Sequence, residues 1–182
     1  MIGLAKSEYN RAGQLVAFIV ESLTVLDDRL GAWRRANAAL TVSRPESVES
    51  IVCASSFLDM SSEHRAVLTH PGRRMAQLEQ LAAHLRDTAL PWFAGSADPR
   101  CVAQAVPDAL LTPWGFAQDL MEFLVTVGQT AEARAVWARV RDLHPNHQHA
   151  FMAGHDMTRS DDRPRLHTPQ AVGWSASVLG LL

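Results

Sequence analysis

The chain has few of the features that define several common protein classes. Its 182 residues include one lysine, one tyrosine and two cysteines. The cysteines, Cys53 and Cys101, are far apart, so they form neither a disulfide framework nor the close ligand pairs of a zinc ribbon. The apolar run near the start, "LVAFIV", is too short for a signal-peptide core or a membrane span. We therefore expect a soluble cytoplasmic protein that does not contact a membrane.

The chain also lacks an excess of positive charge and a phosphate-binding loop. It has 17 basic and 19 acidic residues, and the arginine doublets Arg34–Arg35 and Arg73–Arg74 are isolated, as on solvated faces. Neither G-x-G-x-x-G nor G-x-x-x-x-G-K occurs. These absences argue against nucleic-acid and nucleotide binding. The preference for arginine over lysine, together with abundant alanine, suggests a GC-rich bacterial gene.

Helical periodicity is clear in the C-terminal two thirds of the chain. Apolar residues recur at helical spacing in 72–90, where Pro91 is expected to end the helix. Asp98 followed by proline, and Thr112 followed by proline, both match a helix cap with proline at the first helical position. The last helix of this region is expected to start with Thr130 as its cap.

The segment 113–143 predicts two antiparallel helices, because the connection "GQT" is too short for another arrangement. Gly128 lies at the turn, small Ala133 allows close approach, Trp137 follows, and Pro145 comes after the second helix. This pattern resembles a single tetratricopeptide-type hairpin. No second copy is evident, so we do not expect a repeat array.

The N-terminal third can be interpreted in two ways. Segments 13–22, 36–43, 49–55 and 64–70 could each be a strand, and β-branched residues in 15–25 and 48–52 favour this. The alternative is helical, because leucines and isoleucine in 15–30 also recur every three to four residues.

The stretches "RAGQLVAFIVES", "ALTVS" and "HLRDTALPWFAGSADP" resemble a family of bacterial domains of unknown function, over roughly residues 9–100. The resemblance implies a small antiparallel sheet followed by helices, and it implies no particular activity.

We therefore predict one α+β domain over 1–156. Its sheet would cover about 9–70 and its helices about 72–144. Residues 157–182 would form a polar connector and an apolar tail that docks back on the domain. The alternative fold class is all-α, with helices in 11–41 and 45–60.

The segment "HPNHQHAFMAGHD", residues 144–156, is rich in histidine. The main interpretation is a polar connector after a helix, with no metal or other cofactor. The alternative is a site for zinc or another divalent metal, in which the protein would be a metal-dependent hydrolase. Its ligands would be His144, His147, His149 and His155.

No strong catalytic motif occurs, so whether the chain is an enzyme is left open, with a non-catalytic role favoured. Rigid aromatic side chains often dominate contact surfaces. We predict a non-catalytic protein-interaction or binding module with a protein partner. The candidate binding residues are Trp92, Phe93, Trp114, Phe116 and Trp137.

Overall fold

The computed structural model describes the backbone of residues 2–9, 12, 15–43, 51–56, 66–67, 71–95, 97–160 and 162–182. The chain separates into two compact units, which are described one at a time. The N-terminal unit comprises residues 1–25 and 54–97, and the C-terminal unit comprises residues 26–53 and 98–182.

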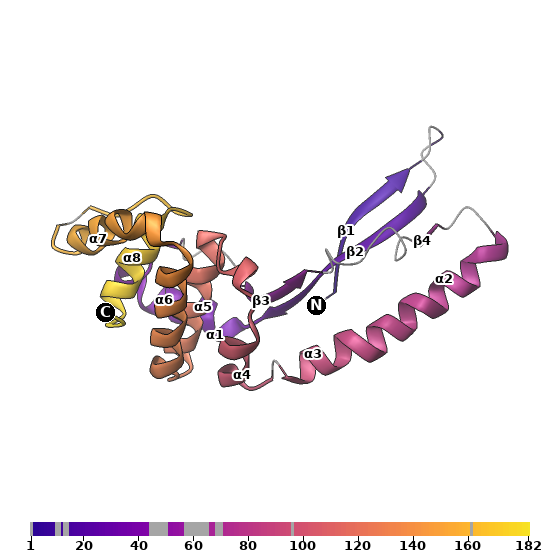
Figure 1. Ribbon diagram of the computed structural model, residues 1–182, viewed down its shortest axis with the longest axis horizontal. Helices are drawn as coiled ribbons and strands as arrows, with labels where there is room; N and C mark the ends of the chain where they lie inside the picture. Colours follow the sequence, from indigo (N-terminus) through magenta and orange to yellow (C-terminus); the bar gives the residue numbers. More distant parts are fainter. Residues whose placement is uncertain are drawn as a thin grey trace. The chain divides into compact units, whose positions relative to one another are not determined.

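The N-terminal unit contains β-strands and one long helical segment (Figure 1). Strand β1 (Ile2–Tyr9) pairs antiparallel with β2 (Leu15–Leu26), and β4 (Ala66–Val67) also pairs antiparallel with β2. Strand β3 (Ile51–Ser56) lies across the boundary between the units. The helical segment consists of α2 (Pro71–His84), a π-helical turn (Leu85–Ala89) and α3 (Leu90–Gly95).

Pro91 does not end this helical segment, contrary to the prediction from the sequence. The π-helical turn Leu85–Ala89 comes first, and Pro91 is the second residue of α3. A proline is tolerated in the first turn of a helix, where its missing N–H group has no intrahelical partner to lose. The π-helical turn therefore lets the chain restart a helix at the proline.

The C-terminal unit is built from helices. Short 3₁₀ turns follow α1 (η1, Ala38–Leu40), α4 (η5, Asp108–Leu110) and α6 (η6, Pro145–His147). The α-helices of this unit in chain order are α1 (Asp28–Ala36), α4 (Pro99–Ala105), α5 (Trp114–Thr126), α6 (Thr130–Leu143), α7 (Gln148–Met157) and α8 (Pro169–Val178).

The predicted α+β class is wrong for the part of the chain whose side chains the structure describes. All regular structure there is helical, which fits the all-α class instead. Segment 36–43, one of the four predicted strands, consists of the end of α1, η1 and a short connection. The helical spacing noted in 15–30 does not make that whole range a helix, because Leu15–Leu26 is strand β2 and helix α1 begins only at Asp28.

The predicted helical pair of 113–143 is confirmed as α5 and α6, which pack against each other. Gly128 connects them with a φ of 78°, a conformation that glycine adopts without steric cost. The observed cap of each helix lies one residue away from the predicted cap. The cap of α5 is Pro113 rather than Thr112, and the cap of α6 is Gln129 rather than Thr130.

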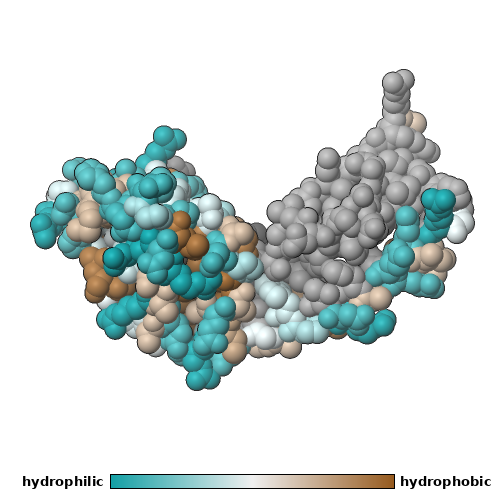
Figure 2. Space-filling view, viewed as in Figure 1, coloured by the Kyte–Doolittle hydropathy of each residue, from teal (hydrophilic) through white to brown (hydrophobic). Residues whose placement is uncertain are grey.

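The core of the C-terminal unit comes mainly from α5, α6 and α8, and the face of this unit shown in Figure 2 is mostly hydrophilic. No helix of the described part of the chain is long and apolar enough to cross a membrane. The largest fully buried apolar side chains are Phe151, Leu30, Leu111, Leu120, Met121, Leu124, Val102 and Val136.

Helices α7 and α8 make the closest helix–helix contact in the unit. A Cβ atom on Gly154 would overlap the carbonyl oxygen of Gln170, and one on Gly173 would overlap the carbonyl oxygen of Phe151. The two backbones therefore touch where the helices cross. Trp174 on α8 and Leu181 after it are both buried.

We expect Gly173→Ala to destabilise the C-terminal unit by about 1–3 kcal/mol or more, because its methyl group would meet backbone rather than a movable side chain. The measurement is the free energy of unfolding by urea denaturation. Gly31→Ala is the matched control, since a Cβ there would lie 3.6 Å from the flexible end of Arg35. The control should be neutral or gain up to about 1 kcal/mol from helix propensity. Equal losses in both variants would contradict the close α7–α8 contact.

Candidate functional site

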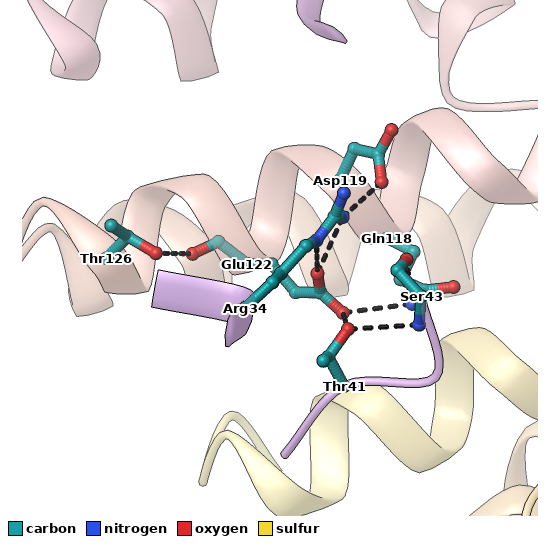
Figure 3. A network of polar contacts seen from close by, with 7 residues as sticks. All are labelled: Arg34, Thr41, Ser43, Gln118, Asp119, Glu122 and Thr126. Carbon is teal, nitrogen blue, oxygen red and sulfur yellow. Dashed lines mark hydrogen bonds and ion pairs between the residues drawn. The ribbon is translucent and has the colours of Figure 1, made fainter. Parts of the chain in front are cut away.

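A buried ion cluster joins α1 to α5 (Figure 3). The Arg34 side chain on α1 is 4% exposed, and the Glu122 side chain on α5 is fully buried. Arg34 Nη2 forms ion pairs with Glu122 Oε2 and with Asp119 Oδ1, which lies about one turn earlier on α5. One guanidinium therefore faces two carboxylates.

Three side chains donate hydrogen bonds to the Glu122 carboxylate. Arg34 Nε donates to Oε2 at 2.6 Å, while Thr41 Oγ1 and Gln118 Nε2 both donate to Oε1 at 2.9 Å. Arg163 Nη1 in turn donates to the carbonyl oxygens of Ala38 and Thr41. The chain after α1 is thus hydrogen-bonded both to α5 and to Arg163, which lies between α7 and α8.

The pKa values of the cluster follow from burial and from the unequal charges. Burial raises the pKa of Glu122 and the pKa of Asp119 above their ordinary values, and the attraction of Arg34 offsets this only in part. Burial alone would lower the pKa of Arg34, but the two carboxylates outweigh it and raise that pKa. Removing the charge from either carboxylate is therefore easier than removing it from Arg34.

A pocket of about 480 Å³ lies beside this cluster, at the N-terminal end of α5. Most of its lining is apolar, and the side chain of Asp119, 25% exposed, brings one edge of the ion cluster into it. The lining residues are Pro113, Trp114, Gly115, Phe116, Asp119 and His167.

His167 closes one side of the pocket from the loop before α8. Its φ of 58° is the one positive value among the non-glycine residues that the structure describes. Its ring lies directly over Gly115, where a Cβ atom would come within 2.5 Å of His167 Nδ1. Backbone strain of this kind persists where the surroundings hold it in place and often marks a functional position.

The indole of Trp114 is held in place by aromatic neighbours. Its ring centroid lies 4.5 Å from that of His144, 5.1 Å from His147 and 5.9 Å from Phe151. These neighbours come from the end of α6, from η6 and from α7. The wall that Trp114 provides is therefore formed before any ligand arrives.

The structure separates the five predicted binding residues. Trp114 and Phe116 line the pocket, whereas Trp137 is in the core against Phe151. Trp92 and Phe93 form an edge-to-face pair on α3, in the N-terminal unit. Of the five predicted binding residues, Trp114 and Phe116 therefore lie together in the pocket.

The four predicted metal ligands do not converge on one point. His144 and His147 face Trp114, His155 Nδ1 lies 2.7 Å from Ser177 Oγ, and His149 is exposed. No three His, Cys, Asp or Glu side chains of the described part of the chain, which includes all four histidines, are grouped as a metal would require. The connector interpretation does not hold for Gln148–Met157, which is helix α7.

Comparisons with known proteins gave no match for this chain. No family model, no curated protein and no solved structure matches the chain. The resemblances to a domain family and to a tetratricopeptide-type hairpin thus stay predictions.

Sequence reasoning missed Arg34, Asp119, Glu122 and His167. It assigned the arginine doublet to a solvated face, which holds for exposed Arg35 but not for buried Arg34. One signal was present in the sequence. Glu122 falls at the same helical face as Gln118 and between buried Met121 and Phe123, where a carboxylate needs a charged partner.

Replacing Arg34 with leucine should destabilise the protein by about 3–5 kcal/mol, because buried Glu122 and half-buried Asp119 would lose their counter-charge. Urea denaturation measures the change. Arg35→Leu is the matched control on the next, exposed position and should change the free energy of unfolding by no more than about 0.5 kcal/mol. A loss below about 1 kcal/mol for Arg34→Leu would contradict the cluster as described.

The raised pKa of Glu122 predicts a particular dependence of stability on pH. The folded state holds the Glu122 proton more tightly than the unfolded state, whose pKa is near the ordinary 4.5. The resulting stabilisation is complete below that value and is lost as the pH rises through the raised pKa. The wild type should therefore lose stability relative to Glu122→Gln as the pH rises from about 4 toward neutrality.

The measurement is the free energy of unfolding of both proteins across this pH range. Comparing the two cancels the titration of the histidines and of the other carboxyl groups that they share. If the wild type instead gains stability relative to Glu122→Gln as the pH rises, the pKa of Glu122 is lowered and the assignment is wrong.

Proposed function

We propose that the protein is a non-catalytic protein-interaction module, and that the pocket at the start of α5 receives a side chain of the partner. The observation that carries this proposal is the pocket of about 480 Å³ with Trp114 and Phe116 in its wall. Rigid aromatic side chains around a preformed hollow are typical of the centre of a binding surface. We further propose that the protein acts in the cytoplasm, in keeping with a chain that has no disulfide framework.

The surroundings of the pocket support binding rather than catalysis. The pocket brings together one carboxylate, Asp119, and one imidazole, His167, without a hydroxyl or thiol side chain among its lining residues. The Ser177–His155 pair lies elsewhere, and no carboxylate of the described residues hydrogen-bonds to His155 to orient it. Nucleophilic catalysis generally needs such a third group.

A photo-crosslinking experiment in the native cell tests the proposal. The photoreactive analogue benzoylphenylalanine replaces Phe116, and crosslinked partners are identified by mass spectrometry. We expect a partner whose crosslink is lost when Trp114→Ala is added, because removal of the indole opens one wall of the pocket. The matched control is Trp92→Ala, which removes a half-buried tryptophan from the other unit and should leave the crosslink intact.

Circular dichroism must show that both variants keep their helix content. A crosslink that survives Trp114→Ala, or the absence of any specific crosslink at position 116, would contradict a binding role for this pocket.

A further inference from the structure

We infer that the pocket beside the ion cluster selects a cation on an aliphatic chain, namely a lysine side chain of the partner protein. This inference rests on the proposed function and names the chemistry of the group that is bound. It depends on three features of the described residues: the charge of the cluster, the arrangement of the Asp119 oxygens and the apolar wall.

The charge of the cluster is unbalanced. Arg34 is the one basic side chain ion-paired with Asp119 and Glu122 among the described residues, so with both carboxylates ionised and the imidazole of His167, which also interacts with Asp119, uncharged, the cluster carries one net negative charge. Glu122 is fully buried, whereas Asp119 reaches the pocket. A cation entering the pocket would supply the missing counter-charge at a site of reduced dielectric, where ion pairs are stronger than in water.

The arrangement of the Asp119 oxygens favours an ammonium over a guanidinium. Oδ1 accepts the hydrogen bond from Arg34, and Oδ2 accepts none from a described residue. In Figure 3 the second oxygen of Asp119 points away from Arg34. A guanidinium binds a carboxylate best through both oxygens at once, whereas an ammonium is a compact charge that a single oxygen can hold.

The apolar wall suits the rest of a lysine side chain. Pro113, Trp114 and Phe116 can cover its four methylene groups, and an aromatic face also attracts a nearby ammonium. The partial positive charge at the N-terminus of α5 opposes a cation, but it is about half a charge and fades within the first turn. Asp119 is the sixth residue of α5 and carries a full charge.

The test uses three small probes, the N-acetyl amides of lysine, norleucine and arginine; norleucine is lysine without its ammonium, and arginine carries a guanidinium on a chain one methylene shorter. Binding is followed by the NMR signal of the Trp114 indole N–H, assigned by its loss in Trp114→Phe. We expect the lysine probe to bind in the millimolar range and the norleucine probe, which lacks the ammonium, about tenfold more weakly. The arginine probe should also bind more weakly than the lysine probe.

Two variants locate the charge that is recognised. Asp119→Asn keeps an oxygen that can accept from Arg34 but removes the negative charge, and it should weaken the lysine probe about tenfold. The matched control is Asp108→Asn, which removes an exposed carboxylate that pairs with Arg139 outside the pocket. It should leave binding unchanged. Should Asp119→Asn fail to fold, the comparison of the three probes on the wild type still shows whether the pocket prefers an ammonium.

The inference is overturned if norleucine binds as well as lysine, if arginine binds more tightly, or if none of the probes binds. A crosslink at position 116 that depends on Trp114 would survive each of these outcomes. The proposed function would then stand with a different occupant of the pocket, so the two failures can be told apart.

Discussion

The C-terminal unit depends on the pairing of Arg34 with Glu122. A carboxylate in a helical core is costly unless a charged group and several hydrogen-bond donors surround it. Glu122 obtains these from α1, from the chain after α1 and from its own helix. Residues 34–43 and α5 are about 80 positions apart in the chain, so this pairing specifies which segments pack together. An apolar contact could hold them equally tightly, but it would select the partner less sharply.

The same cluster links the core to the surface. Its second carboxylate, Asp119, is shared between Arg34 and the pocket, so the charge that the pocket presents is set inside the protein. The pocket walls are fixed from other directions. Aromatic rings of α6, η6 and α7 hold Trp114, while the loop before α8 holds His167 over Gly115. Helices far apart in sequence thereby determine one small site.

The close crossing of α7 and α8 makes this arrangement possible. Gly154 and Gly173 allow the two backbones to touch, which places α8 in the core and brings its preceding loop to the start of α5. A larger residue at either glycine would separate the helices. The segment that the sequence predicted as a tail is thus a structural part of the C-terminal unit, and it contributes His167 to the pocket.

The sequence by itself determined the α5–α6 pair, its buried faces and the cap at Asp98, because helical spacing and helix-breaking residues act within a few positions. It did not determine the fold class, since short apolar runs satisfy strand and helix patterns alike. The burial of Arg34 and the pocket around Asp119 were decided by tertiary structure alone. Both depend on residues brought together from distant segments, and no local pattern records which charges will meet or which aromatic residues will share a wall.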